Sequence, residues 1–132
     1  MKKTTYKKAG YQCEICGGRG EKWPVECHEV WDYNDAKQIQ KLSNLTALCP
    51  DCHRVKHIGL ANIQGVADRA EAHLAKINHW NTNQVNDYLE IVWDTWDKRS
   101  SHDWNLDLAF LNQLGIQSDK LSGFISSRDR FL

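Results

Sequence analysis

The chain has 132 residues, with 17 Lys and Arg balanced by 17 Asp and Glu, and 41% of its residues are hydrophobic. This length suits one compact domain and is short for two, and the composition excludes a mainly disordered chain. No apolar run is long enough to span a membrane, and none follows the first lysines as a secretory signal would require. We therefore expect a single-domain cytoplasmic protein, residues 1–132, with no membrane partner.

The neutral total hides an uneven distribution of charge along the chain. Residues 1–59 carry ten Lys and Arg against seven Asp and Glu, whereas residues 60–132 carry seven against ten. The first part is thus the side expected to face a polyanion. Residues 1–9 are rich in lysine and show no periodicity, which predicts a flexible, solvated terminus; the alternative is a basic arm that touches phosphates.

Two cysteine pairs share one spacing, with two residues between the members of each pair: Cys13 and Cys16, then Cys49 and Cys52. Four thiolates in two such knuckles are typical of a structural zinc site. Two disulfides are one alternative, but a reducing cytoplasm disfavours them. Thioredoxin-like redox chemistry at one pair is the other, but redox-active cysteine pairs seldom occur as two matched knuckles. The spacing therefore predicts one structural Zn²⁺ on these four residues.

The stretch 23–32 contains aromatic and β-branched residues between turn-forming segments, which predicts a strand. His28 lies within it, flanked by Cys27 and by Glu26 and Glu29. Burial of so many polar side chains in an apolar core costs free energy unless each of them is hydrogen-bonded. Taken alone, however, a histidine of this kind is more often an ordinary hydrogen-bonded residue than a functional one.

The stretch 36–48 is expected to begin with a short turn or helix, and residues 45–48 are apolar enough to pair back on the earlier strand. If the chain is helical from Cys52, His53 and His57 lie at positions i and i+4 on one face and could hold a single metal ion. The predicted order is strand, loop, strand, helix.

The remainder is predicted to be mainly helical. Apolar residues recur at three and four positions from Leu60 to Ile77, which predicts one long amphipathic helix, and a second is expected after Asn81. A short extended piece at 104–108 and a closing helix at 109–114 follow. His73 has no partner at ligand spacing and is expected to be a surface or packing residue.

The order of these motifs resembles the HNH endonuclease family, whose ββα-metal finger is flanked by zinc knuckles. The resemblance covers about residues 11–58 and rests on four elements: Cys13-x-x-Cys16, Glu26-Cys27-His28-Glu29, Ser43-Asn44-Leu45 and Leu48-Cys49-x-x-Cys52-His53. It implies an α+β fold, in which a zinc-stapled ββα-metal (HNH/His-Me) finger at 11–58 is followed by a helical extension at 59–132 that packs on it.

The resemblance also implies roles for individual residues. His28 matches the histidine that acts as general base, and Asn44 matches an asparagine that either holds the loop beside this base or ligates the metal. His53 matches a ligand of the catalytic ion. His57 adds the second helical ligand that occurs in the colicin-like branch of the family.

Cys27 departs from the family pattern, which usually has Asp or His before the base as the remaining metal ligand. A thiolate would favour zinc or another thiophilic ion over magnesium. We predict a catalytic ion on His53, His57 and Cys27. The alternatives are Glu26 or Glu29 as the ligand, a weakened site, or Cys27 as a small buried hydrophobic residue.

The resemblance implies a metal-dependent HNH endonuclease that hydrolyses DNA phosphodiester bonds, with a structural Zn²⁺ and a catalytic divalent cation (Zn²⁺, Mg²⁺, Mn²⁺ or Ni²⁺). Arg54 and Lys56 are expected to contact phosphates without reading sequence. The alternative function is a catalytically inactive zinc-finger-like module that binds nucleic acid or protein. It is supported by Cys27 in place of the usual ligand and by the neutral net charge.

Overall fold

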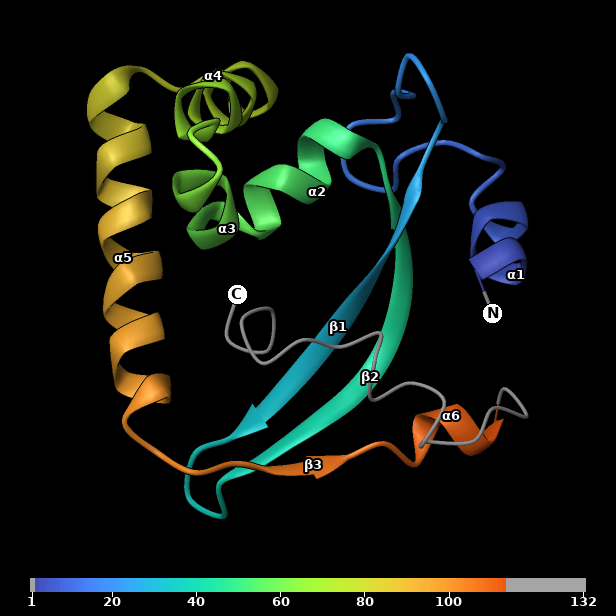
Figure 1. The fold of residues 1–132 in the computed structure, drawn as a ribbon, viewed down its shortest axis with the longest axis vertical. Helices are drawn as coiled ribbons and strands as arrows, with labels where there is room; N and C mark the ends of the chain where they lie inside the picture. The colour runs from blue at the N-terminus through green and yellow to red at the C-terminus, as the bar shows by residue number, and fades with distance from the viewer. Residues whose placement is uncertain (1, 114–132) are drawn as a thin grey trace.

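The computed structural model describes residues 2–113, which are arranged around a long β-hairpin (Figure 1). Its strands, β1 (Glu26–Asn34) and β2 (Ile39–Leu48), are antiparallel, and the short strand β3 (Asn105–Asp107) pairs in parallel with β2. The strand order β1-β2-β3 leaves β1 at an edge of this sheet. The predicted α+β class is confirmed.

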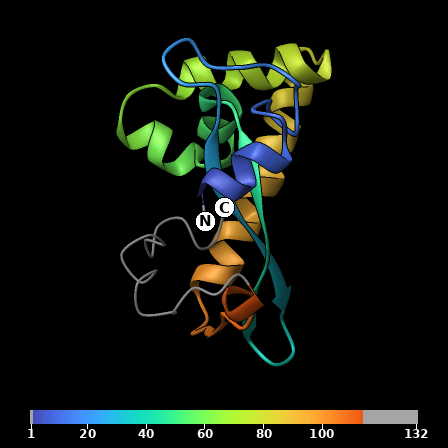
Figure 2. The same ribbon diagram turned by 90° about the vertical axis from the view of Figure 1, so that its right-hand side faces the viewer.

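The described residues also form six helices. They are α1 (Lys2–Lys8), α2 (Pro50–Lys56), α3 (Ile58–Ile63), α4 (Ala67–Asn78), α5 (Thr82–Ser100) and α6 (Phe110–Gln113). Helices α2, α3 and α4 lie at one end of the hairpin and its turn lies at the other, while α1 and α5 stand on opposite sides (Figure 1). The view in Figure 2 shows α1 in front of the hairpin and α5 behind it. Within the described part of the chain, no helix is long and apolar enough to cross a membrane.

Strand β2 contains a β-bulge. Val30 pairs with Asn44 but the next residue, Trp31, pairs with Leu42, so Ser43 is the extra residue. The Ser43 hydroxyl donates a hydrogen bond to the carbonyl oxygen of Val30 at 3.0 Å, which closes the gap in the ladder. A bulge of this kind bends the strand and increases its twist.

The bulge explains why only the end of β2 was predicted. Before it, the buried residues are Gln40 and Leu42; after it, they are Leu45 and Ala47, followed by Leu48 at the end of the strand. The alternation thus changes from even to odd numbers at the bulge. The apolar residues of β2 therefore follow no single period of two. The turn or helix expected at the beginning of 36–48 is limited to the turn before Ile39.

The prediction of a flexible amino terminus was wrong. Residues 2–8 form α1, and Tyr6 on this helix packs against a buried cluster that includes Cys27, Leu42 and Leu45. Leu111 of α6 is buried in the same cluster. Helices α1 and α6 thus cover one face of the sheet, and the packing of the half-buried Tyr6 on this cluster explains why a segment with no helical periodicity is ordered.

The single helix predicted from Leu60 to Ile77 is two helices. Helix α3 ends at Ile63 and α4 begins at Ala67, and Gly65 in the break has a φ of +76°, which favours glycine. The break allows α4 to pack against both α2 and α3. Their core with α5 is formed by Ile58, Ala61, Ala70, Leu74, Val85 and Leu89.

The start of α5 and the pieces after it agree with the prediction. Asn81 is the N-cap, and its side chain accepts from the Gln84 backbone N–H while the Gln84 side chain accepts from the Asn81 N–H. Strand β3 and helix α6 occupy the predicted extended piece and closing helix. The predicted end of that helix, at Leu114 and Gly115, lies outside the described residues.

Gly20 provides a test of how the loop before β1 packs on α2. A Cβ atom at this position would lie 2.2 Å from the carbonyl oxygen of Trp23 and 2.7 Å from Cδ of Pro50. We expect Gly20→Ala to lower the free energy of unfolding by about 1–3 kcal/mol, because backbone must move to admit the methyl group. Urea denaturation measures this loss. Glu21→Ala, in the same exposed loop, should change stability by less than about 0.5 kcal/mol; equal effects would show that the close approach is unimportant.

Candidate metal centres

Four cysteines come together at the start of α2. One sulfur atom from each of Cys13, Cys16, Cys49 and Cys52 lies within 4.8 Å of the others, and the Sγ atoms of Cys16 and Cys49 are 3.7 Å apart. A zinc ion with bonds of about 2.3 Å to four sulfurs at tetrahedral angles would separate them by about 3.8 Å. All five cysteines of the chain are free of disulfides. This group could hold a metal ion, as the spacing predicts.

Local hydrogen bonds hold the two knuckles in place. Cys49 is the N-cap of α2, where its Sγ accepts from the backbone N–H of Cys52 at 3.4 Å. The carboxylate of Glu14, in the first knuckle, accepts from the Thr46 hydroxyl at 2.5 Å and from the Ala47 N–H at 2.6 Å. These bonds attach the first knuckle to the end of β2, just before the second.

The thiol pKa values show why a cation suits this group. Burial raises the pKa of Cys49 to about 11, and burial together with the neighbouring cysteines raises that of Cys52 further. Burial also opposes the thiolate of Cys13, but backbone hydrogen bonds overcome it and lower the pKa to about 7. Four adjacent thiolates repel one another, so all four can be deprotonated only when a cation offsets their charge.

His73 is a partner of this cysteine group that the sequence analysis missed. Its Nε2 lies 3.1 Å from the Sγ of Cys52, although it was expected to be a surface or packing residue. Spacing could not reveal the contact, because His73 is on α4 and reaches Cys52 only through the packing of α4 on α2.

The cysteine group provides a test of metal-dependent folding. Cys49→Ser should lose bound zinc and cooperative unfolding, because it removes one ligand and weakens the N-cap of α2. Zinc content by elemental analysis and thermal unfolding by circular dichroism measure both effects. Folded wild-type protein that contains no zinc would contradict the assignment.

Three histidines form a second group beside the first. Nδ1 of His28 lies 3.2 Å from Nε2 of His57, which lies 3.0 Å from Nε2 of His53. His28 comes from β1, and the other two come from successive turns at the carboxyl end of α2. The structure thus brings together the two helical histidines predicted as ligands and the histidine predicted as a base.

The geometry of these rings fits one shared cation. Nε2 of His57 can carry either one N–H or one lone pair, so it cannot make two well-directed neutral hydrogen bonds to His28 and His53. Three nitrogens bound to one ion at about 2.0–2.1 Å would lie about 3.3 Å apart, close to the observed distances. Burial, followed by the nearby His57 and His53, lowers the pKa of His28 to about 3. At neutral pH its ring is therefore uncharged and able to bind a metal.

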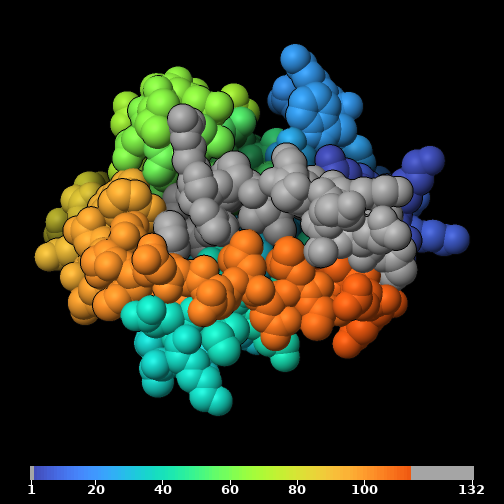
Figure 3. Space-filling view, turned by 60° about the horizontal axis from the view of Figure 1, so that its bottom comes forward, coloured from blue at the N-terminus to red at the C-terminus, as the bar shows by residue number. Residues whose placement is uncertain are grey.

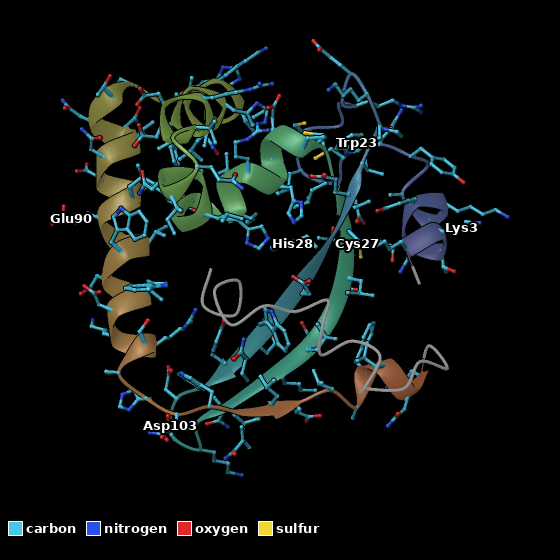
Figure 4. The ribbon with its side chains drawn as sticks, viewed as in Figure 1. Lys3, Trp23, Cys27, His28, Glu90 and Asp103 are labelled. Atoms are coloured by element: carbon cyan, nitrogen blue, oxygen red, sulfur yellow. The ribbon has the colours of Figure 1, made fainter. Side chains whose placement is uncertain are left out.

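The group of nitrogens that could hold an ion consists of His28, His53 and His57, and it does not include the predicted ligand Cys27. Successive residues of a strand point to opposite faces. Figure 4 shows His28 on the side of β1 that faces α2 and α3, and Cys27 on the side that faces α1. Cys27 packs in the apolar cluster, where burial raises the pKa of its thiol. This matches the alternative in which Cys27 is a small buried hydrophobic residue.

Glu26 supports the histidine group from outside it. Its Oε1 lies 3.0 Å from Nδ1 of His53, and its Oε2 accepts a hydrogen bond from the indole Nε1 of Trp23 at 3.0 Å. A carboxylate that accepts the Nδ1 proton leaves the Nε2 lone pair of His53 directed at the other two rings. Glu26 thus contacts His53 from outside the group of three histidine nitrogens that could hold an ion.

Two of the three histidines, His53 and His57, line a pocket of about 460 Å³ at the free edge of β1. It is lined by Lys2, Tyr6, Trp23, Val25, Glu26, Cys27, Glu29, His53, His57 and Leu60. Figure 3 shows the segment around residue 20, in light blue, projecting from the surface beside the green helices α3 and α4. The pocket gives a small ligand access to the histidine group from solvent.

Three other predicted residues lie away from this pocket. Asn44 lines a different pocket with Thr4 and Thr5, and its Oδ1 accepts from the Leu45 backbone N–H at 2.9 Å. Arg54 forms an ion pair with Asp51, with 2.7 Å between Nη1 and Oδ1. Lys56 lines a pocket beside α4. The structure thus does not bring Asn44 to the histidines, and Lys2 lines the pocket whereas Arg54 and Lys56 do not.

Comparisons with protein-family models, curated proteins and solved structures find no match for this chain. The assignment of the site therefore rests on the residues and their geometry.

The contact between Glu26 and His53 leads to a prediction about metal affinity. Glu26→Gln should weaken metal binding at the histidine group by about 10–100-fold, because the amide cannot accept from both Trp23 and His53. Titration calorimetry with Mn²⁺, Ni²⁺ or Zn²⁺, on protein that retains its cysteine-bound zinc, measures the change. Asp51→Asn, which removes a carboxylate from the same helix, should leave the affinity unchanged. Equal affinities for Glu26→Gln and wild type would show that the contact does not support the ligand.

Proposed function

We propose that the protein is a metal-dependent HNH-type endonuclease that hydrolyses phosphodiester bonds of DNA. The observation that carries this proposal is the convergence of three histidine nitrogens, from β1 and α2, beside an open pocket. Three protein ligands with room for a further one are the arrangement of catalytic metal sites, whereas structural sites are closed by four. In the same proposal the four cysteines hold a structural zinc that staples the finger.

The residues of the site fit the needs of phosphodiester hydrolysis. A divalent ion on the three histidines would polarise the phosphoryl oxygen and offset the charge that develops in the transition state. His28, His53 and His57 hold that ion, and Glu26 keeps His53 in position. Lys2, at the rim of the same pocket, is placed to attract a phosphate of the DNA backbone.

The ligand set also changes the expected choice of ion. Imidazole nitrogens suit zinc, nickel and iron, and a set of three neutral rings lacks the thiolate that would have selected a thiophilic ion. The preference for zinc over magnesium that was predicted from Cys27 would then arise from imidazole instead of thiolate. We propose Zn²⁺ or Ni²⁺ before Mn²⁺ or Mg²⁺, because manganese and magnesium favour oxygen ligands.

The arrangement of the elements supports the HNH resemblance. The proposed finger consists of β1, β2 and α2, with one histidine on the first strand, one on the helix and one at the C-cap of the helix. One implied role does not carry over, because a histidine whose lone pair is bound to the ion cannot accept a proton with the same nitrogen. We therefore assign His28 to the ligands instead of the general base.

The rival function, a binding module that does not cut, loses one of its two arguments. Cys27 need not be a ligand when His28 completes the set, so the thiol is no sign of a disabled site. The neutral net charge remains as an argument, but the excess of acidic residues lies in residues 60–132. Residues 1–59, which contain the proposed finger, have an excess of basic residues. Cleavage itself is the observation that separates the two functions.

The proposed function is tested by nicking of supercoiled plasmid in the presence of single divalent ions. His57→Ala should lower the cleavage rate by more than about 10²-fold, since loss of a ligand should cost more than loss of the group that orients one. Excess EDTA should abolish cleavage, and the variant should keep its cysteine-bound zinc.

Two variants serve as controls for this test. His79→Asn changes an exposed histidine at the end of α4, where φ is +55° and asparagine is tolerated, and should cut at the wild-type rate. Cys27→Ala should keep the ion preference of the wild type while losing stability, because its side chain is packed and not bound to the ion. Absence of cleavage by the wild type with every ion would favour the binding module.

A further inference from the structure

We propose that Trp23 stacks on a nucleobase beside the bond that is cut, so that the site prefers DNA with unpaired bases, such as a single strand, over the duplex. This inference rests on the proposed function and deepens it, because it names the form of DNA that the same site takes. It starts from an exposed aromatic side chain at the pocket that His53 and His57 also line.

Trp23 has 50% of its surface exposed, although tryptophan is highly buried on average. Single exposed hydrophobic residues are common on proteins and need no function. Trp23 differs from the others in its position. Among the exposed large hydrophobic residues in the described part of the chain, it alone lines the pocket beside the histidine group. Figure 4 shows it near the beginning of β1, the strand that carries His28.

Hydrogen bonds hold both the side chain of Trp23 and the loop around it. Its Nε1 donates to Oε2 of Glu26 at 3.0 Å, and Oε1 of the same carboxylate lies 3.0 Å from Nδ1 of His53. The backbone N–H of Gly20 donates to the carbonyl oxygen of Pro24 at 3.0 Å, which closes the loop. An aromatic ring that is already held in place loses little conformational entropy when a ligand stacks on it. Trp23 is thus a preorganised surface, linked through Glu26 to a proposed ligand of the ion.

The pocket offers separate partners for the parts of a nucleotide. The proposed ion would take the phosphate that is cut, and Lys2 would attract a neighbouring phosphate. Aromatic side chains stack on bases without reading sequence, since every base has a π face. The other aromatic residue among the described residues of the pocket, Tyr6, packs on the apolar cluster under α1. Trp23 is therefore the residue placed to receive a base.

Stacking on Trp23 requires a base with a free face. In a duplex, neighbouring bases cover both faces of an internal base, and a side chain reaches them only by unstacking the DNA. A base that is already unpaired leaves the stack at a lower cost. We therefore expect a preference for single-stranded or locally unpaired DNA. Supercoiled plasmid remains a substrate, because negative supercoiling favours local unpairing.

The inference is tested by the binding of a fluorescein-labelled oligothymidylate and of its duplex with oligodeoxyadenylate. Both carry phosphorothioate linkages to slow cleavage, and binding is measured by fluorescence anisotropy at saturating Ni²⁺. Trp23→Ala should weaken binding of the single strand by about 5–150-fold, the usual contribution of one stacked base, and change binding of the duplex by less than about two-fold. Trp96→Ala, which removes another exposed indole on α5 and away from the pocket, is the matched control and should change neither affinity.

Two further variants separate stacking from support of Glu26. Trp23→Phe and Trp23→Leu both lose the indole N–H, but only Trp23→Phe keeps an aromatic face. Trp23→Phe should bind the single strand more tightly than Trp23→Leu, which should resemble Trp23→Ala. The affinity of the histidine group for Ni²⁺, measured by titration calorimetry, should change alike in all three, since each loses the same hydrogen bond to Glu26. Thermal unfolding checks that the variants are folded.

Cleavage provides a second measurement, on the same oligonucleotides with ordinary phosphate linkages. At saturating Ni²⁺, kcat/KM of the wild type should be higher for the single strand than for the duplex. Trp23→Ala should lower the value for the single strand by the same factor as the affinity and leave the value for the duplex nearly unchanged.

The outcomes separate this inference from the proposed function. Wild-type protein that cuts no DNA overturns the function, while the binding of the variants still decides whether Trp23 stacks. If the wild type cuts and Trp23→Ala binds the single strand as tightly as the wild type, only the role of Trp23 is overturned. Equal losses in Trp23→Ala, Trp23→Leu and Trp23→Phe, or a wild type that prefers the duplex, would also contradict stacking.

Discussion

Both candidate metal centres depend on the register of β1 against β2. Glu26 pairs with Leu48, so the beginning of β1 lies beside the end of β2, and α2 begins only two residues later at Pro50. This pairing places His28 next to His53 and His57. A shift of one residue would turn Cys27 toward α2 and His28 toward α1, because neighbouring side chains of a strand face opposite sides.

The short helix α2 and its two cap residues contribute side chains to both candidate metal centres. Cys49 and Cys52 lie at its first turn, and His53 and His57 follow directly, so movement of the helix start would also move the histidines. The hydrogen bonds of Glu14 to Thr46 and Ala47 attach the first cysteine knuckle to β2. The cysteine group therefore has a positional role in addition to its contribution to folding, since the proposed catalytic ligands need a helix whose beginning is held in place.

The two glutamates that flank Cys27 and His28 illustrate how position on a strand decides which neighbours a side chain meets. Glu26 lies on the same side of β1 as His28 and accepts from the ring of His53. Glu29 lies on the side of Cys27, yet it borders the same pocket because β1 is an edge strand. Identical side chains three residues apart can thus have different relations to one proposed ion.

The sequence alone determined the groups whose geometry is local. The spacing of Cys13 with Cys16 and of Cys49 with Cys52, and the separation of His53 and His57 by one helical turn, suffice to bring those ligands together. The tertiary structure decided the rest: the bulge at Ser43, the contact of His73 with Cys52, and the placement of His28, not Cys27, beside His53 and His57. Each depends on strand pairing or helix packing between residues distant in sequence, and an alternating pattern cannot show which face of a strand will meet the helix.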